Sequence, residues 1–258
     1  MNGSSPRLSC RGLALRIGGR TLCNALDLDV DAGQCVAVIG PNGAGKTTLI
    51  ATLAGLRAPA AGTIAYDGTP LGLLAMRERA RIRGWVSQDS FDPFPASALE
   101  IALAGRHPYL SQFMWESAAD VDCARAALAR FGVAELAARD VRTLSGGERR
   151  RVALAALVAQ APRLMLLDEP TSHLDPGHQI AALDALTELA RAEGKAIVMA
   201  LHELHLAVRY ADRVVALDGS DASTGPAGEM LTAARLTALF GTPLVAAGDG
   251  RARTFVPA

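Results

Sequence analysis

The sequence predicts an α/β fold in which a mostly parallel β-sheet forms the core and a helical segment is inserted into it. Short apolar runs alternate along the chain with longer stretches of helical periodicity, which is typical of this class. Several of those runs lack polar alternation, as expected for strands that are covered on both faces. From about Asp89 to Gln160 the pattern changes to apolar helical periods with few β-branched runs, and this part opens with the Pro-containing loop Ser90–Ser97. We therefore expect a helical insertion there.

The composition is that of an ordinary globular protein. The chain has 258 residues, of which 50% are hydrophobic and 20% charged, enough for one large domain or two small ones. Its 26 basic and 26 acidic residues balance, so it has no overall electrostatic attraction to nucleic acid or to an acidic membrane. This balance does not exclude a local basic patch.

The cysteines and the apolar runs bear on the compartment. Cys10, Cys23, Cys35 and Cys123 are not spaced as Cys-x-x-Cys, which disfavours a zinc site or a redox pair and fits a reduced, cytosolic compartment. The N-terminus lacks the apolar core of a signal peptide, and no run of 18 apolar residues occurs. We therefore expect neither secretion nor a membrane span, while docking onto a membrane protein stays open.

The apolar runs and helical periods give the order of the elements. Strands are expected at Cys35–Gly40, Leu164–Asp168, Ala196–Leu201 and Arg213–Leu217. Helices are expected after Gly45, across Ala118–Arg130, after Ser145, after Pro176 and near Ala233–Phe240. The polar stretch Asp218–Gly228 predicts a surface turn or a weak hairpin.

A phosphate-binding loop follows the first of these strands. The stretch matches G-x-x-x-x-G-K-[ST] and comprises Gly40, Pro41, Asn42, Gly43, Ala44, Gly45, Lys46, Thr47 and Thr48. Its glycines let backbone N–H groups close around phosphate oxygens, and the helix N-terminus adds partial positive charge. Lys46 can reach the β- and γ-phosphates, and the Thr47 hydroxyl can ligate Mg²⁺. The alternative is a glycine turn before a helix.

An acidic pair ends the strand Leu164–Asp168. Ligands of open α/β sheets bind at the carboxyl ends of the strands, where Asp168 can hold Mg²⁺ through water. Glu169 is then placed to polarise an attacking water as general base. The alternative is a strand that simply ends on two acids before the turn at Pro170.

Two further polar residues end apolar runs. Gln88 follows "GWVS" and His202 follows "AIVMAL". If both strands lie parallel to the phosphate-loop strand as its neighbours, both side chains could face the γ-phosphate; taken singly, each could be a plain loop residue. His202 and His205 are three residues apart, whereas a zinc protease helix needs H-E-x-x-H, so we do not expect a metal there.

A second glycine-containing stretch, "TLSGGERRR" (Thr143–Arg151), has no lysine. Ser145 and Glu148 match a helix capping box, which does not explain Gly146 and Gly147, since each glycine costs about 1 kcal/mol in a helix relative to alanine. Glycines there indicate that something must approach the backbone closely. The three arginines are interpreted as a solvated face, and because no aromatic residues are interleaved we expect no nucleic acid partner.

Taken together, these motifs resemble an ABC transporter ATPase subunit in order and spacing, from about Leu8 to Val256. The resemblance is carried by Gly40–Thr48, Gln88, Leu144–Glu148, Leu164–Glu169, Ser172–Asp175 and His202. It implies a P-loop NTPase (RecA-like) core with a mostly parallel sheet, an N-terminal antiparallel β part and an inserted α-helical subdomain. It implies one domain over 1–258, with a nucleotide-binding core at 7–88 and 162–240, a helical subdomain at 89–161 and a C-terminal extension at 241–258.

The resemblance also assigns roles to these residues. It implies ATP and Mg²⁺ as cofactors and a head-to-tail homodimer, in which each ATP lies between the phosphate loop of one subunit and the second glycine stretch of the other. The implied catalytic residues are Lys46, Gln88, Glu169 and His202, with His202 as the switch that contacts the γ-phosphate. The implied Mg²⁺ ligands are Thr47, Gln88 and Asp168, and Gln88 would also sense the transmembrane partner. The implied signature residues are Leu144, Ser145, Gly146, Gly147 and Glu148. The implied D-loop residues, which cross the dimer, are Ser172, His173, Leu174 and Asp175.

The sequence departs from the family at the base-binding end. The family usually places an aromatic residue before the phosphate loop to stack on adenine, whereas Ile17 stands at that position here. A flat aliphatic contact can still cover the base, so the phosphate chemistry is better specified than base selectivity and affinity.

Three stretches are similar to the ATPases of importers for ferric siderophores, haem and cobalamin. They are Gly105–Leu110, Thr171–Gln179 and Leu201–Arg213, with Glu203 and His205 departing from the Asp and Asn common there. The similarity implies an energy-coupling subunit peripheral to the cytoplasmic face of the inner (plasma) membrane, with two permease subunits and, indirectly, a periplasmic or extracellular substrate-binding protein as partners. Ferric siderophore or cobalamin is favoured over haem. Another importer, an exporter and a soluble non-transport ABC ATPase are the alternatives, and the substrate itself is not encoded in these residues.

Overall fold

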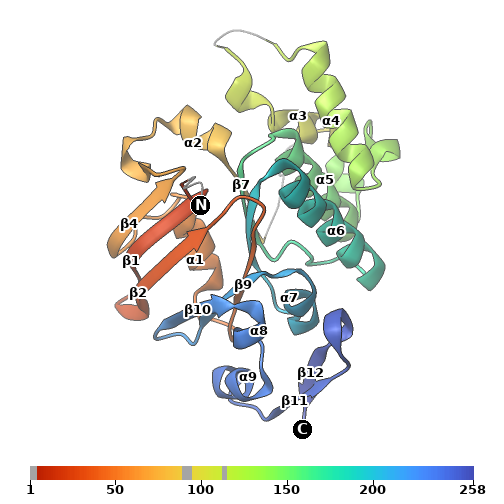
Figure 1. The fold of residues 1–258 in the computed structure, drawn as a ribbon. Helices are drawn as coiled ribbons and strands as arrows, with labels where there is room; N and C mark the ends of the chain where they lie inside the picture. The colour runs from red at the N-terminus through yellow and green to blue at the C-terminus, as the bar shows by residue number, and fades with distance from the viewer. Residues whose placement is uncertain (1–4, 89–94, 112–114) are drawn as a thin grey trace.

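The computed structural model describes residues 5–88, 95–111 and 115–258, and it confirms the predicted α/β class. A main sheet of mostly parallel strands stands at the centre, with an antiparallel sheet on one side and helices on the other (Figure 1). In the described residues the α-helices are α1 (Lys46–Leu53), α2 (Met76–Ile82), α3 (Ala98–Ala104), α4 (Ala118–Arg130), α5 (Gly146–Ala159), α6 (Pro176–Glu193), α7 (Leu204–Tyr210), α8 (Ala227–Met230) and α9 (Ala233–Phe240). The strands are β1 (Leu8–Ile17), β2 (Arg20–Val30), β3 (Cys35–Ile39), β4 (Ala61–Tyr66), β5 (Thr69–Pro70), β6 (Arg83–Val86), β7 (Leu164–Asp168), β8 (Ala196–Ala200), β9 (Arg213–Leu217), β10 (Ala222–Pro226), β11 (Leu244–Ala247) and β12 (Thr254–Pro257).

The main sheet has the strand order β10-β9-β3-β8-β7-β6. Its pairs are parallel except for β9–β10, which is an antiparallel hairpin. The polar stretch from Asp218 to Gly228 therefore supplies the turn and the second strand of a hairpin whose first strand is β9. Because parallel strands end at the same edge, the residues that follow β3, β8, β7 and β6 are brought to one side of the sheet.

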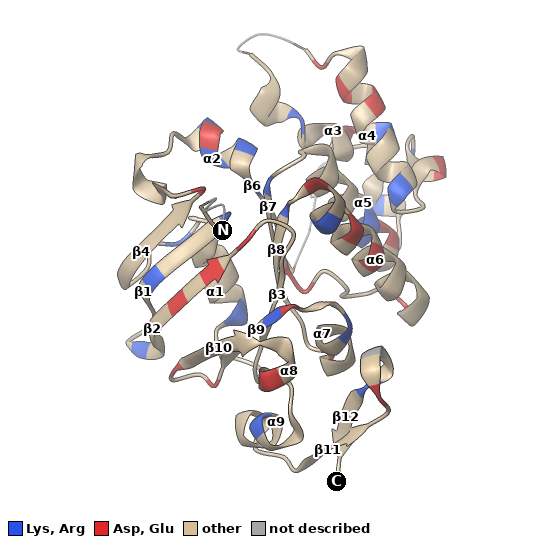
Figure 2. Cartoon of the chain, viewed as in Figure 1, with Lys and Arg blue, Asp and Glu red and all other residues tan. Residues whose placement is uncertain are grey.

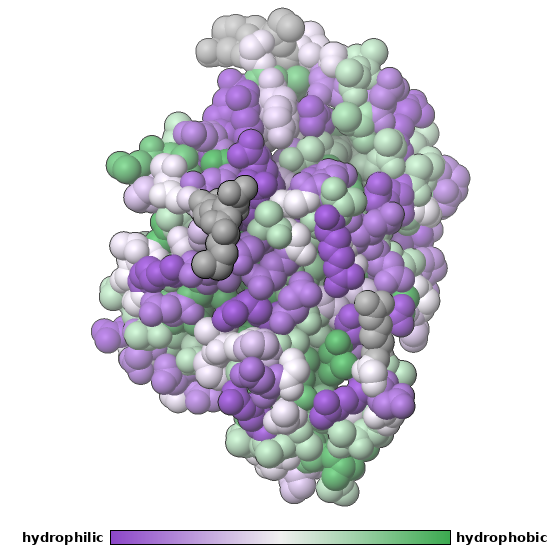
Figure 3. Space-filling view, viewed as in Figure 1, coloured by the Kyte–Doolittle hydropathy of each residue, from purple (hydrophilic) through white to green (hydrophobic). Residues whose placement is uncertain are grey.

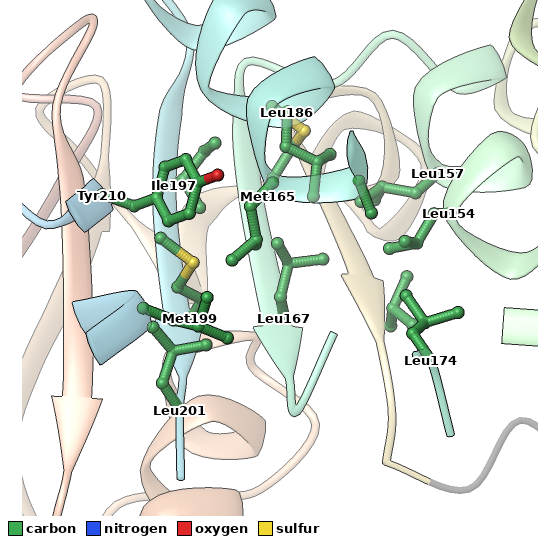
Figure 4. Close-up of a cluster of buried hydrophobic side chains, with 14 of the residues drawn as sticks. Leu154, Leu157, Met165, Leu167, Leu174, Leu186, Ile197, Met199, Leu201 and Tyr210 are labelled. Atoms are coloured by element: carbon green, nitrogen blue, oxygen red, sulfur yellow. The ribbon is translucent and has the colours of Figure 1, made fainter. Parts of the chain in front are cut away.

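Strands β3, β7 and β8 of the main sheet are buried on both faces, as their apolar runs predicted. Cys35, Ala37 and Ile39 of β3 join one hydrophobic cluster, and the alternate residues Val36 and Val38 join the other. The same alternation occurs in β7. Figure 4 shows side chains of β7, β8, α5 and α6 meeting in the first cluster. The helical insertion and the strand that carries Asp168 therefore share one packed core.

The antiparallel sheet that the resemblance implied is present near the N-terminus. It has the order β2-β1-β4-β5, and its inward side chains form the second cluster together with α1. Leu8, Leu13 and Leu26 are fully buried there. The sheet positions Ile17, the last residue of β1, beside the phosphate loop.

Between β6 and β7 the described residues form helices and loops, with one isolated bridge between Ser97 and Asp140. Ser97 caps α3 and Ser117 caps α4, each with a reciprocal capping box, and α4 has the predicted bounds. Most of the predicted loop Ser90–Ser97 lies outside the described residues. Charges of both signs are interspersed along α4, α5 and α6 (Figure 2).

The C-terminal part adds α8, α9 and the β11–β12 hairpin, which packs on α7. The face in Figure 3 is largely hydrophilic, with smaller hydrophobic patches. Within residues 5–88, 95–111 and 115–258, no helix combines the length and the apolar character needed to cross a bilayer.

Candidate functional site

A cavity of about 590 Å³ opens at the carboxyl edge of the main sheet. It collects most of the residues that the sequence singled out for phosphate chemistry. They are Ile17, Asn42, Gly43, Gly45, Lys46, Thr47, Thr48, Gln88, Glu169 and His202, joined by Arg20 and Leu22. The tertiary structure thus brings five separate segments of the chain to one place.

The phosphate loop is shaped by its glycines. Gly40 has a φ of 151°, and a Cβ there would lie 2.1 Å from the backbone oxygen of Leu217, so no larger residue fits. Gly45 precedes α1 with a φ of 104°. Lys46 is 6% exposed, and its Nζ donates to the backbone oxygens of Gly40 at 2.8 Å and Pro41 at 3.2 Å. Burial lowers the pKa of Lys46, and the nearby Glu169 and Asp168 carboxylates oppose that shift.

Asp168 ends β7 as a buried carboxyl group. It is 1% exposed, and neither of its side-chain oxygens has a hydrogen-bond partner among the described residues. Burial raises its pKa, and the neighbouring Thr47 hydroxyl opposes that shift. A buried carboxylate without a donor is costly unless a cation compensates it, so Asp168 and Thr47 fit Mg²⁺. The described residues contain no group of three or more His, Cys, Asp or Glu side chains that could hold a metal ion.

Glu169 and His202 meet across the cavity. His202 Nε2 lies 2.5 Å from Glu169 Oε1, and the Glu169 side chain is 15% exposed. The backbone of Glu169 has a φ of 51°, a left-handed conformation that a non-glycine residue adopts at some cost and that often marks a functional site. Sequence reasoning selected both residues but did not predict their contact.

Gln88 reaches the cavity from an unexpected strand position. The hypothesis that the strands before His202 and Gln88 both neighbour the phosphate-loop strand holds for β8, which precedes His202, but is wrong for β6. Strand β6 pairs with β7 at the edge of the sheet, and the two residues after it carry the chain back into the cavity. The backbone turn, rather than adjacency in the sheet, places Gln88.

The second glycine stretch begins α5 with the predicted capping box. Ser145 Oγ accepts from the N–H of Glu148 at 3.2 Å, and the Glu148 carboxylate accepts from the N–H of Ser145 at 2.7 Å. These bonds lower the pKa of Glu148, with the backbone donor contributing most. A Cβ on Gly147 would lie 2.9 Å from the backbone oxygen of His173. Within this chain, the close approach that explains the glycine is therefore that of the expected D-loop.

That loop is itself held in a defined shape. His173 has a φ of 64°, and Asp175 caps α6 by accepting from the N–H of His178. The His178 Nδ1 lies 2.6 Å from Asp175 Oδ2, and this partner lowers the pKa of Asp175. The Ser172 hydroxyl is buried and has no hydrogen-bond partner among the described residues.

The interpretation of the three arginines as a solvated face is wrong for Arg150. Its side chain is 3% exposed, because it points back from α5 into the junction with β6 and β7. There its guanidinium donates to backbone carbonyls, including those of Asp168 and Glu169. The pattern "RRR" gave no sign that one member is internal, since neighbouring helical residues point in different directions.

The base-proximal end of the cavity is aliphatic and cationic. Ile17 is 43% exposed, and Leu22 and Arg20 line the cavity beside it. Arg20 donates to the backbone oxygen of Gly219 at 3.3 Å, which ties its guanidinium to the loop after β9. None of the described lining residues is aromatic.

Comparisons with known proteins place this geometry in a family. A model of the ABC transporter family matches residues 23–172. The hemin import ATP-binding protein of Nocardia farcinica is 44% identical over 243 residues, which cover 92% of this chain and 83% of that protein. The cobalamin import ATP-binding protein of Halobacterium salinarum is 40% identical over 234 residues, covering 90% of this chain. Those residues are 58% of the Halobacterium protein, so the chain spans less than two thirds of its length.

A solved structure agrees over the full fold. A chain of a transporter described as metal-chelate type, in an inward-facing conformation, superposes with a TM-score of 0.85. It is 31% identical, and the match covers 98% of this chain and 97% of that chain. The family model, the relatives and the shared fold confirm the resemblance seen in the motifs: the chain belongs to the ABC transporter family.

Proposed function

We propose that the chain is the ATP-hydrolysing, energy-coupling subunit of an ABC importer for a metal chelate, such as a ferric siderophore, cobalamin or haem. The observation that carries the ATPase part is the gathering of Lys46, Thr47, Glu169 and His202 around one cavity, with the buried Asp168 next to Thr47. The importer part is supported by relatives that are named for hemin and cobalamin import. It is also supported by a structural neighbour of metal-chelate type.

The chemistry follows from where these side chains lie. Lys46 exchanges its carbonyl partners for phosphate oxygens, which brings its charge to the transferred group. Glu169 accepts a proton from the attacking water at its carboxylate, and the contact with His202 fixes the orientation of that carboxylate. Thr47, Asp168 and Gln88 would hold Mg²⁺, which would supply charge neutralisation when bound. Ile17 and Arg20 cover the base.

The complete site requires a second copy of the chain. We propose a head-to-tail homodimer in which Leu144–Glu148 of one subunit and Ser172–Asp175 contribute to the nucleotide site of the other. The N-terminus of α5 is suited to γ-phosphate oxygens, because the capping box uses only the N–H of Glu148 among the first-turn donors and the helix adds partial positive charge there. Lysine is unnecessary in that stretch because Lys46 already serves the same nucleotide.

The membrane partner would dock where the helical part meets the core. We place the boundaries at 7–88 and 162–240 for the core, 89–161 for the helical subdomain and 241–258 for the C-terminal extension. Arg81 of α2 donates to Pro108 at 2.9 Å across the junction between the two parts, and Leu73 and Met76 nearby in sequence are 78% and 86% exposed. Two permease subunits on a dimer of this chain, at the cytoplasmic membrane face, form the proposed importer.

Two experiments test this function. Purification of the chain from membranes of its own cells should recover a multi-span permease, identified by mass spectrometry; recovery of none would contradict the importer.

The Glu169→Gln variant should dimerise on addition of ATP, and adding Ser145→Arg should abolish the dimer. If dimers persist with Ser145→Arg, Ser145 only caps its own helix and does not contribute to the partner's nucleotide site.

A further inference from the structure

Arg150 has no part in the proposed chemistry, although it is buried at the centre of the catalytic loops. It lies five residues after Ser145, within the first turns of α5. Its guanidinium donates to carbonyls of two separate segments, one following β6 and the other at and after the end of β7. The acceptors are the backbone oxygens of Ser87 (2.5 Å), Gln88 (3.5 Å), Asp168 (2.5 Å), Glu169 (2.5 Å) and Pro170 (3.2 Å).

A guanidinium is well suited to joining segments in this way. It is planar and always charged, and its five N–H donors point in fixed directions, so several acceptors can be held in one arrangement. Hydrogen bonds from a charged donor are also stronger than neutral ones. Because Arg150 is 3% exposed, water cannot easily replace these bonds. A displacement of either carbonyl segment therefore has to move the guanidinium or break buried bonds.

The carbonyls that Arg150 holds belong to functional segments. Glu169 is in the left-handed region, with a φ of 51°, and Arg150 bonds both its carbonyl and that of the preceding residue. The same guanidinium bonds the carbonyl of Gln88, whose side chain lines the cavity. Arg150 thus supports the backbone on which the proposed base and the proposed sensor are mounted.

Arg150 connects the loops after β6 and β7 to the start of α5. Leu154 and Leu157 of α5 pack with Met165 and Leu167 of β7 in one buried cluster, so the helix rests on the strand that carries Asp168 (Figure 4). A helix transmits a displacement along its length because its backbone hydrogen bonds are continuous. Ser145 and the glycines that follow it are only one to two turns from Arg150.

We infer that Arg150 is a positioning residue that makes the start of α5 and the loops carrying Gln88 and Glu169 move as one unit. Nucleotide in a subunit's own cavity then sets the position of Leu144–Glu148, which serves the partner's nucleotide. The two sites of the dimer are coupled through this side chain. The inference rests on the proposed function, because it requires the head-to-tail dimer.

The test uses the full chain carrying Glu169→Gln, in which ATP binding and ATP-driven dimerisation are measured separately. Fluorescent ATP gives the affinity of the monomer at low protein concentration, and light scattering gives the dimer fraction. Adding Arg150→Gln should leave the monomer affinity within about threefold but raise the ATP concentration for half-dimerisation about tenfold or more, a coupling loss of at least about 1.4 kcal/mol. Arg150→Lys, which has its donors on a single ammonium, should need an ATP concentration for half-dimerisation between those of the parent and the Arg150→Gln variant.

Arg151→Gln is the matched control on the same helix. Arg151 donates to the carbonyls of Phe131 and Gly132 at 3.2 and 2.8 Å, which both belong to the helical part, so it joins no catalytic loop. The Arg151→Gln variant should change the ATP concentration for half-dimerisation by less than about threefold. We expect this even if its melting temperature falls as far as that of the Arg150→Gln variant. This control separates a loss of coupling from a general loss of stability.

The outcomes distinguish the inference from the function on which it rests. Dimerisation of the Arg150→Gln variant at the parent's ATP concentration would overturn the inference and leave the proposed function standing. If dimerisation weakens in both the Arg150 and the Arg151 variants in proportion to the fall in their melting temperatures, Arg150 has only a structural role. A Glu169→Gln parent that binds ATP but never dimerises would contradict the proposed dimer, and the inference would fall with it.

Discussion

The imidazole of His202 and the carboxylate of Glu169 lie in direct contact, with 2.5 Å between Nε2 and Oε1. They come from the ends of β8 and β7, which are adjacent strands of the main sheet. The contact gives the proposed base one fixed orientation, since its backbone is also held in the left-handed region. Removal of either partner should therefore act on turnover more than on nucleotide binding.

We expect Glu169→Gln to lower kcat about 10²- to 10⁴-fold, because an amide cannot accept the proton of the attacking water. His202→Ala should lower kcat about tenfold or more with little change in KM, since it removes orientation rather than binding. Phosphate release over a range of ATP concentrations gives both constants. The control is His205→Ala, which changes an exposed histidine on α7 and should keep wild-type turnover. Equal effects at His202 and His205 would refute a specific role for the pair.

Asp168→Asn should stabilise the protein without nucleotide and remove its response to Mg²⁺. Burial raises the pKa of Asp168 above the ordinary 3.8, so the folded state binds its proton more tightly than the unfolded state does. Stability from this group is then present below pH 3.8 and is lost as the pH rises through the folded pKa. At neutral pH the neutral amide avoids that cost, and the melting temperature should rise.

Thermal unfolding with and without Mg²⁺ and ATP checks this expectation. The parent should gain stability from Mg²⁺ with ATP, as any ligand of the folded state provides. The Asn variant should gain much less from adding Mg²⁺ to ATP. A variant that melts lower than its parent without ligands would show that the carboxylate is already compensated within the chain.

Ile17→Tyr should tighten ATP binding by supplying an aromatic face at the base end of the cavity. Aromatic stacking contributes about 0.5–1.5 kcal/mol beyond area burial, so we expect a gain of about two- to tenfold in affinity. Inorganic triphosphate, which has no base, should bind both proteins equally. Displacement of a fluorescent nucleotide measures both ligands, and an equal gain for triphosphate would show that residue 17 does not contact the base.

Gly147→Ala tests the close approach between α5 and the proposed D-loop, Ser172–Asp175. A Cβ 2.9 Å from the backbone oxygen of His173 forces a shift that costs about 1–3 kcal/mol, against a helix propensity gain of at most about 1 kcal/mol. We therefore expect a net loss of up to about 2 kcal/mol in urea unfolding. Gly228→Ala is the control, because a Cβ there meets no atom within 4 Å. An unchanged free energy of unfolding for Gly147→Ala would mean that the D-loop yields without cost.

Local sequence patterns specify the chemistry-bearing segments and most of the elements around them. The phosphate loop, the acidic pair after β7 and the bounds of α4 and α9 were all readable, because each depends on local spacing, capping or an unbroken apolar run. The hairpin at β9–β10 was likewise signalled by its polar turn residues. Local physics fixes such features before the chain is packed.

Tertiary packing sets how those segments meet. It put β6 at the sheet edge rather than beside β3, and it joined His202 to Glu169. It also buried Arg150, although the stretch of three arginines predicted a solvated face. Strand order, side-chain burial and contacts between residues far apart in the chain depend on how whole elements pack, and no short stretch of sequence contains that information.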